Sequence, residues 1–381
     1  MFTLIENGEV YGPEPCGQKA VLLVNDRIAI VGTVDRSAML ALGVPCDVID
    51  ASGCLVIPGL IDPHEHLLGG SGEQGFNTQT PEVYLHEIVT AGITTVVGCL
   101  GVDTTMKTLP GLLAKVKALR EEGMSAYMYT GGYNIPPTTV LASPREDLLF
   151  LDEVIGIGEI AIADDRSTDP QPHELARVAS EAYVGGLLNN KAGVSHFHVG
   201  PCEQRLAVLW KVLDDYNVQP AWIYPTHIER SEVLMQEAIA LAHRGSFVDI
   251  DTVEEDLPQW LQFYINNDGD LGRLTVSSDA SISSPRTLFE QIRTCIRDYH
   301  LPLVQVLPLV TANTAAVLKL PRKGRLAPGN DADVLVLRQR SLDIVHVIAR
   351  GRCMVRDGEL VVKERFLTNS NRRVSLYGQN A

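Results

Sequence analysis

The 381-residue sequence lacks the features that point to a membrane, a nucleic acid or a disulfide-stabilised scaffold. No window has the apolar length that a bilayer-spanning helix requires. Basic residues are scarce, with 32 Lys and Arg against 47 Asp and Glu, and the net charge of −15 argues against a nucleic acid or an anionic membrane as partner. The hydrophobic content of 45% and the charged content of 21% are those of an ordinary globular protein.

The cysteines are odd in number, scattered and without any Cys-x-x-Cys spacing: Cys16, Cys46, Cys54, Cys99, Cys202, Cys295 and Cys353. This pattern predicts reduced thiols rather than a disulfide framework. Residues 1–7 contain no basic segment followed by an apolar core, so we expect no signal peptide. Together these observations predict a cytoplasmic protein.

Both ends of the sequence have the composition of short strands separated by turns. Strand-like segments occupy residues 20–24, 27–31 and 46–50, and again residues 332–337, 346–350 and 359–362. Neither end is long enough to bury a good core alone. We therefore predict that residues 1–54 and 324–381 combine into one small β-sandwich domain, and that residues 55–323 form a second domain.

Strands alternate with helices between the two ends. The helical patterns cover residues 109–122, 172–189, 204–216, 231–244 and 285–299. Strand candidates are residues 55–61, 94–99, 126–130, 159–163, 195–199, 221–225, 247–250 and 274–278. Eight strands with interleaved helices predict an α/β fold of the (β/α)₈ TIM-barrel type.

Histidine and carboxylate side chains gather at the carboxyl ends of these predicted strands. His64 and His66 follow the first strand, and residues i and i+2 of a strand project to the same face. The carboxyl ends of barrel strands build the active site, and only ten histidines occur in the chain. The sequence therefore predicts a metal centre made by His64, His66, Glu159, His198, His227 and Asp279.

Coordination chemistry suggests which of these residues bind which of two metal ions. His64, His66 and Asp279 would hold one divalent ion, and His198 and His227 a second, with a carboxylate between them. A bound ion lowers the pKa of water toward ~7 and so makes hydroxide available. Asp279 is placed to act as general base and then general acid. His196 shares the face of His198 but is interpreted as a packed residue behind the site.

The run Pro58–Asp62 before His64 resembles the first strand of the amidohydrolase superfamily of metal-dependent hydrolases. Within that superfamily the chain resembles isoaspartyl dipeptidases nearly end to end. The motifs that carry the resemblance are HEHLLGGSGE (64–73), TPEV (80–83), AGITTVVG (91–98), TGGY (130–133), DRS (165–167), PTHIER (225–230) and SSD (277–279).

The resemblance implies a metallopeptidase that hydrolyses dipeptides linked through the aspartate side chain. It implies that Glu73 binds the substrate ammonium, and that Tyr133 stabilises the oxyanion. Arg166 and Arg230 would bind substrate carboxylates, for which the guanidinium fork is well suited. Ser283 would contact the substrate, as would Ser71, which replaces a loop glycine. The resemblance also implies two divalent ions, expected to be Zn²⁺, and a homo-oligomer.

The sequence departs from that family at the fourth strand. Where the family bridges its metals with a carboxylated lysine, this chain has Glu159, with one extra residue just before it. A lysine carbamate reaches about three atoms farther than glutamate, so Glu159 bridges only if the backbone moves inward. The glycines at 156 and 158 favour such a bulge. The alternative is a site with a single ion.

Two other interpretations stay open. Val102, in place of a substrate-contacting threonine, and a shorter segment after Asp279 allow a different amide substrate, either a cyclic amide or an N-acyl amino acid. Loss of the lysine allows a non-catalytic barrel kept as a scaffold. The four aligned histidines argue against a scaffold, and Glu73 argues against a cyclic amide, which has no free ammonium.

Overall fold

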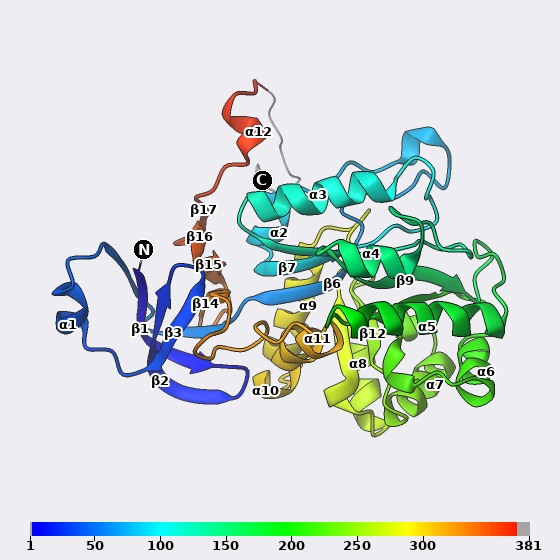
Figure 1. Ribbon diagram of the computed structural model, residues 1–381. Coiled ribbons are helices and arrows are strands. Elements are labelled where there is room, and N and C mark those ends of the chain that lie inside the picture. The colour runs from blue at the N-terminus through cyan, green and yellow to red at the C-terminus, as the bar shows by residue number, and fades with distance from the viewer. Residues whose placement is uncertain (1, 372–381) are drawn as a thin grey trace.

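The computed structural model describes residues 2–371, so residues 372–381 of the predicted terminal domain lie outside the described residues. Figure 1 shows a sheet that combines the blue strands of the N-terminal end with the orange and red strands of the C-terminal end. Beside it lies a larger α/β region coloured from cyan to yellow. Within residues 2–371, no helix has the length and hydropathy needed to cross a bilayer.

One nine-stranded sheet joins the two ends of the chain. Its order is β17-β16-β15-β14-β5-β1-β2-β3, with β4 paired to β1. The pairing of β14 with β5 is antiparallel and continuous over five residues, so segments far apart in sequence share one ladder. The strands are β1 (Phe2–Tyr11), β2 (Pro15–Val24), β3 (Arg27–Gly32), β4 (Cys46–Asp50), β5 (Cys54–Pro58), β14 (Val334–Arg338), β15 (Ile344–Ala349), β16 (Arg352–Arg356) and β17 (Glu359–Leu360).

The strand predicted at residues 55–61 is wrong, because the chain makes two strands there. β5 belongs to the terminal sheet, and β6 (Leu60–Glu65) pairs in parallel with β7 (Ile93–Gly98). Gly59 separates them: a Cβ at this position would lie 2.2 Å from the Thr94 hydroxyl oxygen, so no side chain fits. The apolar run continues across the break because both strands are buried.

The α/β region contains a curled parallel sheet. Six strands pair in the order β11-β10-β9-β8-β7-β6, and β12 pairs with β13. A bridge between Glu65 and Ala280 connects the end of β6 to the segment after β13, which brings the first and last strands of the region together. The remaining strands are β8 (Ser125–Thr130), β9 (Val154–Ile162), β10 (Val194–Val199), β11 (Ile223–Thr226), β12 (Val248–Asp251) and β13 (Leu274–Ser277).

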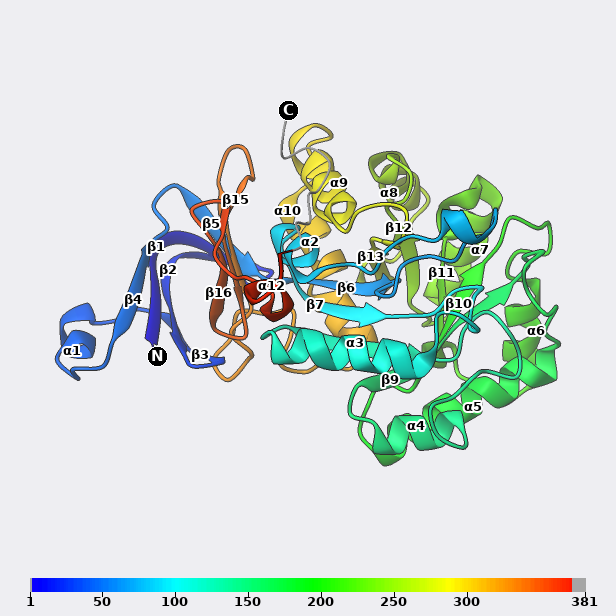
Figure 2. The ribbon, with the colours of Figure 1, turned by 90° about the horizontal axis from the view of Figure 1, so that it is seen from above.

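Helices surround these strands, as the view from above shows (Figure 2). The longer ones follow the predicted patterns closely because their apolar positions face the strands. The helices are α1 (Arg36–Leu40), α2 (Leu85–Thr90), α3 (Leu109–Glu121), α4 (Pro144–Phe150), α5 (Pro172–Leu188), α6 (Ala207–Asp215), α7 (Glu232–His243), α8 (Leu257–Asn266), α9 (Arg286–Arg297), α10 (Leu303–Val306), α11 (Ala312–Val317) and α12 (Arg365–Thr368).

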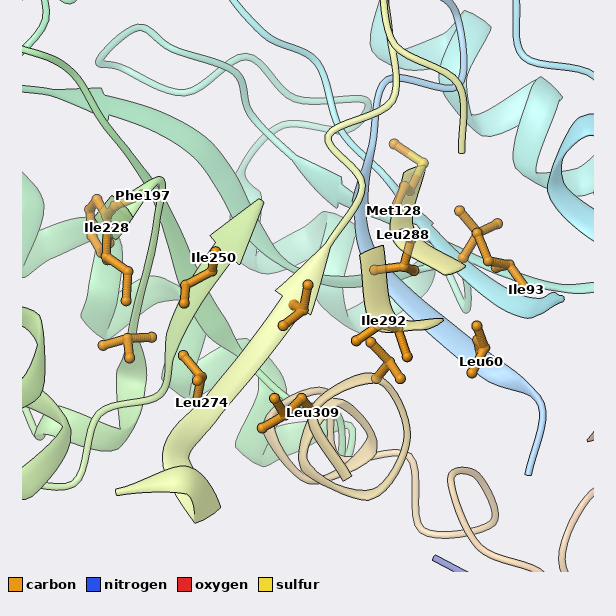
Figure 3. Packing of buried hydrophobic residues seen from close by; sticks show 14 of the residues in the cluster. Leu60, Ile93, Met128, Phe197, Ile228, Ile250, Leu274, Leu288, Ile292 and Leu309 are labelled. Carbon is orange, nitrogen blue, oxygen red and sulfur yellow. The ribbon is translucent and has the colours of Figure 1, made fainter. Parts of the chain in front are cut away.

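The core of the α/β region lies between strands and helices. Figure 3 shows Leu60 and Ile93 from β6 and β7 near Leu288 and Ile292 of α9. All residues of β6, β7, β9 and β10 are buried, which explains why these strands read as apolar runs rather than as alternating patterns. The histidines of these strands lie toward the carboxyl ends, as at His64 in β6 and His198 in β10.

Lys323 connects the terminal sheet to the α/β region. Its ammonium is buried, donates to the Ser125 hydroxyl of β8 at 2.6 Å, and pairs with Asp331 at 2.9 Å and with Asp333. Burial lowers the pKa of Lys323, opposed by the Asp333 carboxylate. The ammonium thus compensates the buried Asp333 carboxylate and shares Asp331 with Arg27 and Arg322.

Replacing Lys323 with Met should destabilise the protein by about 3–5 kcal/mol, because it leaves the buried Asp333 carboxylate without its cation, whereas Asp331 keeps Arg27 and Arg322. Urea unfolding at pH 7 should show a lower midpoint with an unchanged slope. Arg325→Met is the control, since Arg325 pairs with Glu14 at the surface and such pairs contribute about 0–1 kcal/mol. Equal midpoints for the two variants would contradict the assigned role.

Candidate metal centre and active site

Side chains from five strands meet at the carboxyl end of the curled sheet. Nε2 of His64 lies 3.3 Å from Glu159 Oε2 and 3.3 Å from Asp279 Oδ1. Nε2 of His66 lies 3.1 Å from Asp279 Oδ1. On the other side of Glu159, its Oε1 lies 2.6 Å from Nδ1 of His198 and 3.3 Å from Nε2 of His227. Glu159 therefore stands between two pairs of histidines.

Glu159 reaches this position through an irregularity in β9. Ile157 pairs with Ser195 and Ile160 with Phe197, so Gly158 and Glu159 together face one residue of β10. The extra residue is the bulge that the sequence predicted. A Cβ on Gly158 would lie 2.7 Å from the backbone oxygen of the facing residue, so only glycine permits this approach.

The donor set fits a divalent metal. Three buried atoms that converge on one point make no hydrogen bond within the described part of the chain: His64 Nε2, Glu159 Oε2 and Asp279 Oδ1. Buried polar atoms without partners are rare in proteins. Imidazole nitrogens and carboxylate oxygens are also the donors that zinc and related ions prefer. Some of these donors lie close enough to share an ion. One such group consists of His64, His66, Cys99 and Glu159, and another consists of Glu159, His198 and His227.

His196 orients His64 toward this point. The carbonyl oxygen of Tyr224 can only accept, so the 2.9 Å contact assigns the proton of His196 to Nδ1. Nε2 of His196 then accepts from Nδ1 of His64 at 3.0 Å, so Nε2 is the nitrogen of His64 that faces Glu159 and Asp279. His196 thus lies behind the site, and burial lowers its pKa together with the nearby charge of His64.

Two aspartates orient the other histidines in the same way. Asp251 Oδ2 accepts from Nδ1 of His227 at 2.5 Å, and Asp164 Oδ2 accepts from Nε2 of His198 at 3.0 Å. The second ring nitrogen of each histidine faces Glu159. Burial alone would lower the pKa of His227, but the hydrogen bond to Asp251 raises it to about 9.

Charges in the site act strongly on Glu159. Burial alone would raise the pKa of its carboxyl, yet positive charge on His64 and His198 holds that pKa well below the usual range. Glu159 is therefore an anion in a position with no exposed surface. An anion of this kind requires cations around it, either protonated histidines or bound metal.

A cavity of about 440 Å³ opens above these residues. The residues predicted to bind substrate all contribute to its wall: Ser71, Glu73, Tyr133, Arg166, Arg230 and Ser283. Glu73 Oε1 accepts from Arg166 at 2.9 Å, and Arg166 also pairs with Asp164 at 2.7 Å. The cavity thus combines a carboxylate and a guanidinium beside the cluster of histidines.

Tyr133 lies where the cavity meets the cluster. Its hydroxyl is 2.9 Å from Nδ1 of His198, and its ring contacts that of His198 with centroids 4.6 Å apart. Burial raises the pKa of Tyr133 well above its ordinary value, and the Glu159 anion raises it further. The hydroxyl therefore stays protonated and can donate a hydrogen bond into the cavity.

The β-aspartyl dipeptidase of Fervidobacterium islandicum AW-1 has the same fold along nearly its whole length. The two sequences are 36% identical, and its crystal structure matches this one with a TM-score of 0.90. The match covers 94% of this chain and 98% of that one. The chain belongs to the β-aspartyl dipeptidase family. A second structure of the Fervidobacterium protein, 35% identical with a TM-score of 0.90, is a complex with a β-Asp-Leu dipeptide.

This β-aspartyl dipeptidase family member is also similar to more distant proteins. The profile of the Amidohydrolase family matches residues 262–354. Among curated proteins, the adenine deaminase of Halalkalibacterium halodurans is 23% identical over 341 residues, which cover 83% of this chain. The match covers 52% of the deaminase, so the chain spans about half the length of that relative.

The structure brings all the predicted residues of this β-aspartyl dipeptidase family member to one end of the sheet. It adds others that the sequence analysis missed, notably Cys99, Asp164, Asp251 and Lys107. Asp251 and Cys99 follow the same strand-end rule that identified the histidines, since β12 ends at Asp251 and Cys99 directly follows β7. Lys107, which donates to the Leu68 carbonyl at 2.7 Å, carries no such signal.

Replacing Asp251 with Ala should raise the zinc dissociation constant by about 10–100-fold, because His227 loses the acceptor that fixes its orientation. A competition titration against a chelator of known affinity measures this. Asp165→Ala is the control, since Asp165 is exposed and does not line the cavity. Unchanged zinc affinity in Asp251→Ala would rule out the orienting role.

Proposed function

We propose that this protein is a metal-dependent peptidase that hydrolyses the side-chain amide bond of isoaspartyl dipeptides. The observation that carries the proposal is the Glu73–Arg166 pair, 2.9 Å apart, beside the histidine cluster. A dipeptide of this class has a free ammonium and free carboxylates close to its amide bond. A neighbour that is 35% identical over nearly the whole chain was solved with such a dipeptide, β-Asp-Leu.

Two divalent ions, which we propose to be Zn²⁺, fit the donors. His64, His66 and Asp279 would hold one ion and His198 and His227 the other, with one oxygen of Glu159 toward each. Such ions lower the pKa of bound water and polarise the carbonyl of the substrate. Glu159 thereby takes the place of the carboxylated lysine that the resemblance implies.

Substrate binding would exchange partners in the Glu73–Arg166 pair. The ammonium of the aspartyl residue replaces the guanidinium at Glu73, and a substrate carboxylate replaces Glu73 at Arg166. Asp164 remains bonded to two nitrogens of Arg166, so the fork keeps its direction during the exchange. Arg230, anchored to the Val199 carbonyl at 2.8 Å, offers a second site for a carboxylate.

Proton transfer in the proposed reaction depends on Asp279. The positive charge of nearby histidines lowers the pKa of Asp279 despite its partial burial, so it begins as a carboxylate. It accepts the proton of the attacking water and passes it to the departing amine nitrogen. Tyr133 donates its hydroxyl proton in a hydrogen bond to the developing oxyanion.

The proposed architecture for this chemistry is a (β/α)₈ barrel with a β-sandwich domain made by both ends of the chain. The order of β6 to β13 and the Glu65–Ala280 bridge support closure of the barrel. The shared ladder of β5 and β14 supports the terminal domain. In such a barrel the active site lies at the carboxyl ends of the strands, where the histidines gather.

The test is hydrolysis of β-Asp-Leu by the purified, zinc-loaded protein, with leucine release as the measurement. The isomer α-Asp-Leu is the matched control, because it has the same atoms with the amide on the other carboxyl. N-acetylated β-Asp-Leu, which lacks the ammonium, should be a poor substrate if Glu73 acts as proposed. Dihydroorotate and N-acetyl-leucine test the cyclic-amide and N-acyl alternatives. Cleavage of either one with β-Asp-Leu left intact would overturn the proposal.

A further inference from the structure

Cys99 lies beside the two histidines that follow β6. It is the first residue after β7, and it is 1% exposed. Gly98 pairs with Glu65 in the sheet, and the Cys99 amide donates to the Glu65 carbonyl at 3.0 Å. Cys99 therefore sits next to His66 across the ladder, at the end of the strand where the metal donors gather.

The thiol lies beside the donor cluster, where it donates to the Glu65 carbonyl oxygen at 3.6 Å. Its Sγ lies 3.8 Å from Nδ1 of His66. The donor atoms of His64, His66, Cys99 and Glu159 all lie within 4.8 Å of one another, a spacing at which four groups can bind one ion. In the same cluster, His64 Nε2 and Glu159 Oε2 are fully buried and make no hydrogen bond within residues 2–371.

We propose that the Cys99 thiolate is an additional ligand of the metal ion bound by His64 and His66. This inference rests on the proposed metal-dependent function and adds a sulfur donor to it. When the sulfur–metal bond forms, the thiol loses its proton to solvent, so the ion is held by a thiolate. The site would then hold an ion through imidazole, carboxylate and thiolate together.

A sulfur donor changes which metals the site selects. Thiolates favour soft and borderline ions such as Zn²⁺ and disfavour Mg²⁺ and Mn²⁺, which prefer oxygen. The anionic thiolate also adds negative charge near Glu159, in a chain that has no lysine carbamate at that position. Cys99 would therefore help this site to retain the ion bound by His64 and His66 in the absence of a lysine carbamate.

The decisive measurement is spectroscopic and uses the unmodified protein. The Co²⁺-loaded protein should show a thiolate-to-cobalt charge-transfer band in the near ultraviolet. X-ray absorption of the zinc-loaded protein should include a sulfur neighbour at ~2.3 Å in addition to nitrogen and oxygen at ~2.0–2.1 Å. A cobalt spectrum without that band, and a zinc shell of nitrogen and oxygen alone, would overturn the proposal and leave Cys99 as a packing or hydrogen-bonding neighbour of His66.

Single-residue variants identify the cysteine that supplies the sulfur ligand. Cys99→Ala should lose the charge-transfer band and bind the first zinc ion at least about tenfold more weakly, a loss typical of disturbed metal sites. Cys295→Ala is the matched control, because Cys295 is equally buried but lies on α9 outside the donor cluster. A band that survives in Cys99→Ala would exclude Cys99 as its source.

These results are separable from the proposed activity. If the sulfur signal is present and β-Asp-Leu is not cleaved, the ligand assignment stands and the substrate assignment fails. If the dipeptide is cleaved without a sulfur signal, the reverse holds.

Discussion

Asp279→Asn is expected to lower kcat for β-Asp-Leu by about 10²–10⁴-fold, the range that general acid–base catalysis contributes. The amide of Asn can still lie near the metal donors but cannot take up or release the proton. Nε2 of His66, 3.1 Å from Oδ1, and Nε2 of His64, 3.3 Å away, would keep a polar neighbour. The loss should therefore fall on kcat more than on KM, measured with zinc in excess so that metal loss does not contribute.

Asp103→Asn is the control for this variant. Asp103 lines the same cavity, and its replacement changes the net charge by the same amount, but it does not contact the histidines. Its kcat should stay close to that of the parent protein. The dependence of kcat/KM on pH adds a second criterion, because Asp279→Asn should lose the rise that reports ionisation of the general base. If kcat/KM of Asp279→Asn still falls at low pH as it does in the parent protein, another residue is the general base.

The strand-end residues were predictable because their signal is local. A buried parallel strand reads as an apolar run, and a polar residue at its carboxyl end stands out against it. His64 and His66 satisfy this rule completely. Asp251 satisfies it too, but the acidic residues Glu254 and Glu255 follow it, and such a run is typical of a solvated loop.

Other features depend on contacts that no local pattern reports. β1 was missed because its alternation is interrupted at residues 6–7, where a bulge shifts the register against β2 and Asn7 has φ of 66°. His227 and Asp279 lie in left-handed backbone conformations, with φ of 63° and 46°, which non-glycine residues seldom adopt. Such conformations persist where the surroundings impose them, and they cluster at functional sites.

If Glu159 bridges two ions as proposed, Glu159→Gln is expected to remove one of them and to lower kcat by about 10³-fold. A Lewis-acid ion contributes several kcal/mol of transition-state stabilisation, and each 1.4 kcal/mol is a factor of ten. The amide removes the negative charge that lies between His64 and His227, and it replaces one acceptor oxygen with NH₂. Metal content per chain, measured by plasma emission after gel filtration, gives the result. An unchanged stoichiometry would exclude Glu159 as the bridge.

Glu159→Lys separates a glutamate bridge from a carbamate bridge. If the bulge of β9 already brings the backbone inward, a lysine carbamate is about three atoms too long for the fully buried space that the glutamate fills. Metal reconstitution of Glu159→Lys should then fail with or without bicarbonate, while reconstitution of the parent protein should not depend on bicarbonate at all. Recovery of two ions and of activity by Glu159→Lys in bicarbonate would mean that this strand still has room for the lysine carbamate. In that case the bulge would not be the reason that a glutamate occupies the position.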